Sequence, residues 1–207
     1  MTKIFNIRSF AVSAVVALAT GVSSASAATV LYTTFVTGEN LGAGSQATLE
    51  YKQNGNNVDF WLTNTLNSVA TAFIGAIGFT YNGAKPTVVK ELAGSQAFVA
   101  GLGSQSLNGP FSIDFGVQIG GKGQDKNELV VGETALFRIL GVTASNFDFS
   151  FNKTAIHAQG LSGGGSTKYT ISNDGNTGGP SPVPVPGALS LLLSALGVVA
   201  FVRQRRA

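Results

Sequence analysis

Residues 47–65 read Ala47-Thr48-Leu49-Glu50-Tyr51-Lys52-Gln53, then Asn54-Gly55-Asn56-Asn57, then Val58-Asp59-Phe60-Trp61-Leu62-Thr63-Asn64-Thr65. Two runs that mix apolar and polar residues are joined by glycine and asparagine, the residues that tight hairpin turns prefer. We therefore predict a β-hairpin with strands at residues 47–53 and 58–65.

Strand-like alternation recurs further along the chain. Residues 112–119 alternate strictly, which predicts one apolar face made of Ile113, Phe115, Val117 and Ile119. Residues 146–151 alternate likewise and would place three phenylalanines on the core face. Further strands are predicted at residues 29–37, 71–81, 87–92, 128–140, 155–159 and 168–172, and an isolated short helix is allowed at residues 142–146.

Glycine, asparagine and serine separate these strands at intervals near ten residues, a spacing typical of antiparallel sandwiches. We predict an all-β fold: a single antiparallel β-sandwich, jelly-roll or Ig-like. An N-terminal signal helix and a C-terminal hydrophobic helix are expected to flank it. The predicted segments are a signal peptide at 1–27, the domain at 28–172, a Gly/Pro-rich linker at 173–186 and the hydrophobic helix with its arginine cluster at 187–207.

The N-terminus has the pattern of a secretory signal peptide. Lys3 and Arg8 precede an apolar region at residues 9–22, and Ala25-Ser26-Ala27 supplies the small residues that signal peptidase accepts. We predict cleavage before Ala28. An uncleaved membrane anchor is the alternative, and the short apolar region and small-residue exit favour cleavage.

The C-terminus combines a proline segment, an apolar run and a basic end. Pro180-Ser181-Pro182-Val183-Pro184-Val185-Pro186 is followed by 16 uncharged residues, Gly187 to Val202, and then by Arg203, Arg205 and Arg206. The run is shorter than the ~20 residues that usually span a bilayer and would reach roughly 24 Å as a helix. The arginines are expected to stay cytoplasmic, which places the domain outside the inner membrane. A permanent anchor is one interpretation of this segment.

The charges lie unevenly along the chain. Five of the 13 basic residues lie in the two terminal segments, whereas all 10 acidic residues lie between Glu39 and Asp174. The intervening chain is slightly acidic and has no basic patch, so nucleic-acid binding is disfavoured. The chain has no cysteine, which excludes disulfides, a thiol nucleophile and cysteine-ligated metals.

Catalytic motifs are weak in this sequence. His157 is the only histidine and would have to be the base of any serine triad, yet no Gly-x-Ser-x-Gly elbow is present. Carboxylate pairs for glycoside cleavage are conceivable, but the sequence selects none; the candidates are Asp114, Asp125, Glu128, Glu133 and Asp148. We predict no catalytic residue and no cofactor.

Two further sets of residues are of types that occur in ligand sites. Residues 120–128 lack the Gly-Lys-Ser/Thr ending of a phosphate loop, and Asp125, Asn127 and Glu128 lack EF-hand spacing, so no metal site is predicted. Trp61, Tyr51 and Tyr81 could form a sugar-stacking platform on a sheet face. Aromatic residues on alternating strands are more often core, which is the competing interpretation.

The C-terminal segment resembles the PEP-CTERM sorting signal of Gram-negative bacteria, in which Val-Pro-Glu-Pro precedes a hydrophobic segment and terminal arginines. Val183-Pro184-Val185-Pro186 occupies the motif position, with Val185 in place of the usual glutamate. Residues 132–137 and 155–166 are loosely similar to the bodies of such proteins. The resemblance implies that an exosortase recognises the motif and removes the tail.

The family is generally linked to exopolysaccharide, biofilm and the cell envelope. The resemblance therefore implies an exported, non-enzymatic envelope or matrix protein that passes through the inner membrane and reaches the cell surface or the medium. Two alternatives remain. One is a carbohydrate-binding module for the extracellular polysaccharide, and the other is a secreted hydrolase that uses His157 as its base.

Overall fold

The computed structural model describes residues 27–67, 71–103, 107, 109–121, 127–162 and 164–172. Within these residues the strands pair antiparallel throughout, in one 12-stranded sheet. They are β1 (Ala28–Gly38), β2 (Ala47–Asn54), β3 (Asn57–Asn64), β4 (Phe73–Tyr81), β5 (Val89–Glu91), β6 (Val99–Gly103), β7 (Phe115–Ile119), β8 (Leu129–Val130), β9 (Thr134–Leu140), β10 (Phe147–Asp148), β11 (Thr154–Gln159) and β12 (Thr167–Ile171).

The predicted hairpin is confirmed as β2 and β3. Asn54 pairs with Asn57, so the turn contains only Gly55 and Asn56. Gly55 has a φ of +60°, the positive value that a two-residue hairpin turn requires and that glycine adopts without strain. The ladder continues without a bulge to Ala47 and Asn64.

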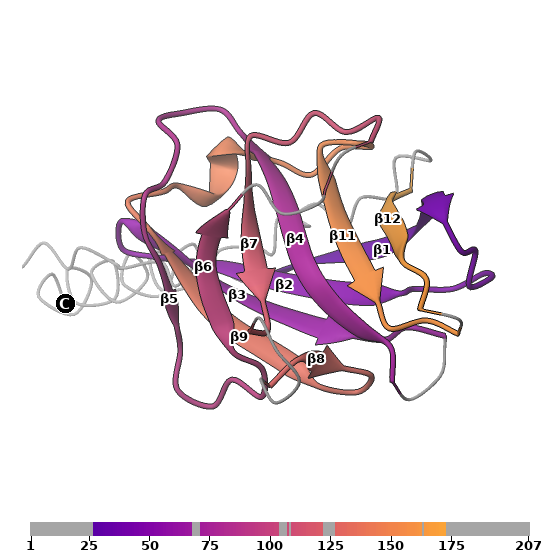
Figure 1. Cartoon of the computed structure of the whole chain (residues 1–207). Coiled ribbons are helices and arrows are strands. Elements are labelled where there is room, and N and C mark those ends of the chain that lie inside the picture. The colour runs from indigo at the N-terminus through magenta and orange to yellow at the C-terminus, as the bar shows by residue number, and fades with distance from the viewer. Residues whose placement is uncertain are drawn as a thin grey trace, which may run out of the picture. The chain divides into compact units, whose positions relative to one another are not determined.

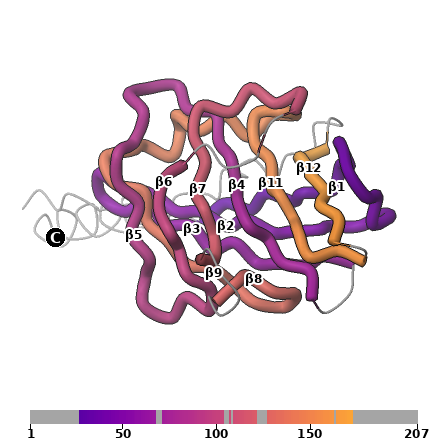
Figure 2. The backbone as a smooth tube through the Cα atoms, viewed as in Figure 1, coloured from indigo at the N-terminus to yellow at the C-terminus, as the bar shows by residue number. Residues whose placement is uncertain are grey.

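The all-β antiparallel prediction is confirmed, but the strands do not form two separate stacked sheets. They follow the order β5-β9-β3-β2-β1-β12-β11-β4-β7-β6, with β8 and β10 added beside β4. In Figures 1 and 2, β1, β2, β3 and β9 form one layer, and β6, β7, β4 and β11 cross it in front. The sandwich prediction fails because β1 pairs with both β2 and β12 and so joins the two layers into one sheet.

The rolled sheet is almost closed. Register shifts interrupt the β1–β12 pairing after Tyr32 and after Phe35, and such irregularities bend and twist a strand. At the other seam, the backbone N–H of Val99 at the start of β6 donates to the Glu91 Oε2 of β5 over 2.8 Å. The two edge strands are therefore bridged by a carboxylate instead of a strand ladder.

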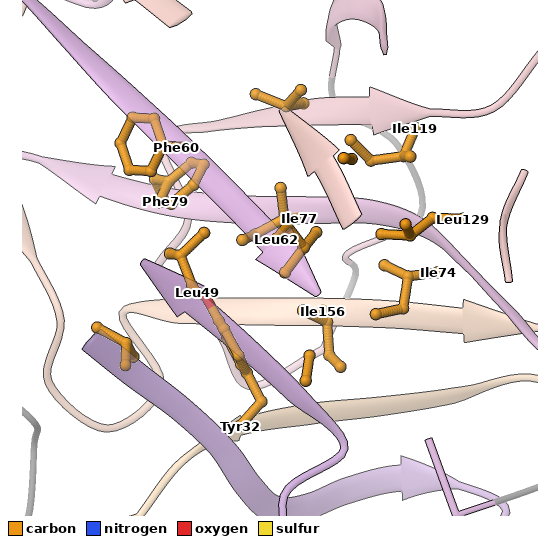
Figure 3. Close-up of a cluster of buried hydrophobic side chains, with 14 of the residues drawn as sticks. Tyr32, Leu49, Phe60, Leu62, Ile74, Ile77, Phe79, Ile119, Leu129 and Ile156 are labelled. Carbon is orange, nitrogen blue, oxygen red and sulfur yellow. The ribbon is translucent and has the colours of Figure 1, made fainter. Parts of the chain in front are cut away.

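The core lies between the two layers. Phe60 and Leu62 of β3 and Ile77 and Phe79 of β4 point into this space and are buried (Figure 3). Aromatic rings fill one part of it: Phe60 stacks on Phe137 with centroids 5.2 Å apart. Buried aromatic side chains contribute the largest apolar areas, which suits a domain that has no disulfide.

The prediction for residues 112–119 holds only in its second half. β7 begins at Phe115. Ile113 lies on the outer face instead, where it packs over Gly78 of β4. A Cβ added at Gly78 would stand 2.9 Å from the Ile113 Cγ2 and 2.5 Å from the Leu107 Cδ1, so only a glycine leaves space for these side chains. Gly78 thus leaves room for the β6–β7 connection to pack over the sheet.

Two other strand predictions were too long. Residues 128–140 divide into β8 and β9, because Gly132 with a φ of +88° makes a turn between them. Residues 146–151 form a strand only at Phe147 and Asp148; Phe149 still packs against the core, whereas Phe151 lies in the following turn. The short helix at 142–146 is present as a 3-10 turn at Ala144–Asn146.

β6 was missed because two glycines interrupt its apolar pattern. Val99 is its only buried residue, and Gly101 and Gly103 follow at alternate positions. The strand is held by its pairing with β7. In that ladder Val99 lies opposite Ile119, and Leu102 lies opposite Val117.

Among the described residues, the first strand begins at Ala28 and the last ends at Ile171, which pairs with Tyr32 of β1. Ala28 and Ile171 therefore lie toward the same end of the sheet, on neighbouring strands and roughly 13 Å apart along β1. The predicted flanking helices lie outside the described residues. Within the described residues, no helix has the length and apolar character that crossing a membrane requires.

Candidate functional site

Trp61 stands on the outer side of the sheet. Its neighbours Phe60 and Leu62 are fully buried, so alternation turns the partly exposed indole away from the core. Across the ladder Trp61 pairs with Glu50 of β2 and Leu136 of β9. We call the outward side chains of β1, β2, β3, β9 and β5 around it the Trp61 face.

A charged row crosses the Trp61 face two residues from Trp61. The registers align Lys52 of β2, Asp59 of β3, Arg138 of β9 and Lys90 of β5. The Arg138 Nη2 donates to the Asp59 Oδ2 over 2.8 Å, the Arg138 Nε donates to Oδ1, and the Asn54 Nδ2 donates to Oδ2 over 2.8 Å. This row holds three cations and one anion.

The Arg138 contact shapes the ionisation of Asp59. Hydrogen bonding to the guanidinium lowers the pKa of Asp59 below its ordinary value, with smaller contributions from Asn54 and from the charge of Lys52. Burial acts in the opposite direction but is outweighed. Asp59 is therefore an anion at neutral pH, and its charge is stabilised by Arg138 and Asn54.

On the other side of Trp61, a row of hydroxyls crosses the same strands. Thr48, Thr63 and Thr134 align, and the Thr63 and Thr134 hydroxyls lie 2.9 Å apart, either being able to donate. Leu31 of β1 ends this row with 46% of its surface exposed. The face thus combines apolar surface, hydroxyls and charges on a regular four-strand ladder.

The three predicted aromatic residues do not share one face. Tyr51 is buried and stacks on Phe149 with centroids 4.6 Å apart, and burial raises its pKa. Tyr81 is also buried, and its hydroxyl accepts from the backbone N–H of Thr143 over 3.1 Å. Of the predicted platform, only Trp61 faces outward.

His157 lies in β11 and is 6% exposed. Its Nδ1 is 3.2 Å from the Gln159 Nε2, and its strand partners are Lys168 and Ala76. Burial lowers the pKa of His157, and the Lys168 charge lowers it further. An amide beside the ring is neither the nucleophile nor the orienting acid of a triad.

The candidate carboxylates have local structural partners. Asp114 accepts from the backbone N–H of Tyr81, and Asp148 accepts from Ser150. Glu133 accepts from the backbone N–H of Val130.

Burial raises the pKa of Glu128. Asp125 lies outside the described residues. Within the described part of the chain, no three histidine or acidic side chains are grouped so that they could hold a metal ion.

The sorting residues fall mostly beyond the described domain. Ala25, Val183-Pro184-Val185-Pro186, Arg203, Arg205 and Arg206 lie outside the described residues. Ala27 is described and exposed, and Ala28 is buried as the first residue of β1, opposite Tyr51.

Sequence reasoning missed most of the Trp61 face. The Glu50–Trp61 pair was readable from the hairpin register, because a two-residue turn at Gly55 and Asn56 aligns them. Arg138 and Lys90 come from strands far along the chain, and no sequence signal pairs those strands with β3.

Comparison with known proteins gives no relative from which a site could be transferred. No protein-family model, curated protein or solved structure matches this chain.

Proposed function

We propose that this chain is an exported, non-enzymatic protein of the cell envelope or extracellular matrix, sorted through its PEP-CTERM-like tail. One observation carries the proposal: β1 begins at Ala28 and β12 ends at Ile171. All strands of the described residues therefore lie between the predicted signal peptide and the predicted sorting tail. Removal of both signals would leave every described strand in place.

The arrangement of the chain ends supports the same function. Ile171 pairs with Tyr32, so Ala28 and Ile171, the described strand ends next to the predicted leader and tail, lie toward one end of the sheet. Both predicted hydrophobic segments can then be held in one membrane while the sheet is complete. The linker at 173–186 would span up to roughly 43 Å in the extended form that prolines favour, which leaves room for a membrane-bound exosortase to reach Pro186.

The destination follows from the resemblance. After release by the exosortase, the domain reaches the cell surface or the medium and associates with exopolysaccharide and biofilm. Its passage through the inner membrane is transient, with Arg203, Arg205 and Arg206 as the cytoplasmic stop.

Intact-mass spectrometry of the protein collected from the cell surface and medium tests this function. We expect a mature chain that starts at Ala28 and ends near Pro186. A Pro184→Ala, Pro186→Ala variant should keep its tail and stay with the membrane, whereas Pro180→Ala, outside the motif, should be processed normally. Surface protein that retains Arg205 and Arg206 would overturn the processing step.

A second candidate function, a carbohydrate-binding module, is favoured by the Trp61 face. An outward indole on a ladder without register shifts, bordered by hydroxyl and charged rows, has the mixture of apolar and polar groups that sugar rings require. The hydrolase alternative would need His157 to be accessible, and that residue is 6% exposed.

A further inference from the structure

We infer that the Trp61 face binds an acidic polysaccharide, with Trp61 stacking on a sugar ring and the charged row holding its carboxylates. The inference rests on the second candidate function and is independent of how the tail is sorted. It names the class of ligand: a polymer of sugars that carry carboxylate groups.

Trp61 supplies the stacking surface. Its ring is partly buried among the neighbouring side chains of the ladder, which limits the rotamer freedom it would lose on binding. An indole ring is apolar and planar, as stacking on the C–H face of a sugar ring requires. The neighbouring Leu136 and the exposed Leu31 extend the apolar area along β9 and β1.

The charged row supplies the preference for acidic sugars. Asp59 is matched by Arg138 and Asn54, and this leaves Lys52 and Lys90 as net positive charges on either side of the pair. Lys90 is exposed and Lys52 partly exposed. The net charge of this row is positive although the net charge of the domain is slightly negative. The row therefore complements an anionic ligand.

The spacing of the two rows fits one polymer. The row through Trp61 and the charged row are two residues apart on each strand, about 6.6 Å. A ring stacked on Trp61 would therefore place its substituents over the charged row. From β2 to β5 that row extends about 14 Å, so carboxylates on separate sugars of one polymer chain can meet Lys52 and Lys90.

Glu50 fixes the orientation of the ligand. It is exposed beside Trp61 on β2, in the row that receives the ring itself. A carboxylate placed over this row would meet Glu50, whereas sugar hydroxyls can donate to it. Glu50 repels ligand carboxylates from the Trp61 row, and Lys52 and Lys90 attract them to the charged row. Together they select one orientation of the polymer as well as increasing its affinity.

The test uses the full chain purified in detergent, with polygalacturonate as the acidic probe and dextran as the neutral one. Because Trp61 is the only tryptophan, its fluorescence reports directly on the site. We expect polygalacturonate to shift this emission, dextran to bind at least about tenfold more weakly, and added salt to weaken the acidic complex.

Three variants separate the contributions. Lys52→Gln, Lys90→Gln should lower the affinity for polygalacturonate about tenfold, and Trp61→Ala, followed by calorimetry, should abolish binding. The matched control is Lys85→Gln, Lys153→Gln, which removes the same charge from elsewhere and should change the affinity less than twofold. Circular dichroism melts confirm that each variant is folded.

The outcomes distinguish the two claims. If dextran binds as tightly as polygalacturonate and Lys52→Gln, Lys90→Gln has no effect, the acidic preference is overturned while carbohydrate binding stands. If the wild-type chain binds neither polymer, both the site and the second candidate function are overturned. If the control pair weakens binding as much as Lys52 and Lys90, the attraction is general and the site assignment fails.

Discussion

Asp59 and Arg138 face each other on neighbouring strands, and the guanidinium grips both carboxylate oxygens from the outer side of the sheet. The paired side chains are 10% and 30% exposed, so solvent screens them only in part. Bidentate pairs of this kind are geometrically selective, and this one fixes how β3 and β9 present the charged row beside Trp61.

Asp59→Asn should lower the free energy of unfolding by about 1–2 kcal/mol at pH 7, since the charge-assisted bonds from Arg138 are lost. The pKa of Asp59 is lower in the folded than in the unfolded state. Its stabilisation is therefore complete above the unfolded pKa, about 3.9, and is lost as pH falls through the folded value. Urea unfolding at pH 7 and pH 3 should show a smaller gap between wild type and variant at pH 3; an equal gap would contradict the prediction.

Phe60→Ala and Trp61→Ala should have very different effects although the residues are adjacent. Phe60 is fully buried and stacks on Phe137, so its loss should cost about 3–5 kcal/mol. Trp61 lies on the outer face, and its replacement should cost about 1 kcal/mol or less. Chemical denaturation followed by circular dichroism measures both. Phe60→Leu provides a milder core change if Phe60→Ala does not fold, and similar losses at both positions would disprove the assigned faces.

Gly38→Ala should destabilise the domain more than Gly44→Ala. Both glycines have positive φ, +100° and +113°, so either substitution introduces backbone strain of about 1–3 kcal/mol. A Cβ at Gly38 would also clash with the Ser166 carbonyl oxygen, whereas one at Gly44 would have no atom of the described residues within 4 Å. The difference between the two melting curves isolates the clash at the β1–β12 pairing. We expect it to exceed about 1 kcal/mol.

Acidification below about pH 6.5 should weaken the domain through His157. Burial and the facing Lys168 depress the folded pKa of His157, so the unfolded chain takes up this proton at a higher pH. The stabilisation is complete above the unfolded pKa and declines as pH falls through the folded value. His157→Gln should remove this part of the pH dependence between pH 7 and pH 5. An NMR titration that gives an ordinary pKa for the ring would refute the prediction.

The same His157→Gln protein tests the hydrolase alternative. Unchanged turnover of any polysaccharide or ester substrate in this variant would eliminate His157 as a general base. We expect no difference between variant and wild type.

The sequence predicted local structure well where a strand carries its own signal. The hairpin of β2 and β3 follows from its mixed apolar and polar runs and one glycine turn, and both strands and the turn are confirmed. Ile113 shows the limit: it continues the alternation of β7, yet the absence of a side chain at Gly78 draws it to the outer face. Alternation within one strand does not reveal that a neighbouring strand has a glycine where a side chain would otherwise stand.

The rolled sheet and the Trp61 face could not be predicted for the same reason. Both depend on which distant strands pair, and the pairing of β1 with β12 or of β3 with β9 is decided by the whole core. The sequence identified Trp61 as a candidate but grouped it with Tyr51, which belongs to the other face of the same hairpin. Adjacent register positions, Glu50 with Trp61 and Tyr51 with Phe60, separate the two.

The central position of β1 has a consequence for timing. If the chain is exported as proposed, β1 emerges first among the described strands but pairs with β12, the last of them, so the described sheet stays incomplete until β12 has emerged. Contacts between such distant segments make folding slow. A hydrophobic tail that paused export after β12 and the linker at 173–186 would hold the nearly complete chain at the membrane for that interval. The tail would then delay the release of the domain until it has folded, in addition to directing its sorting.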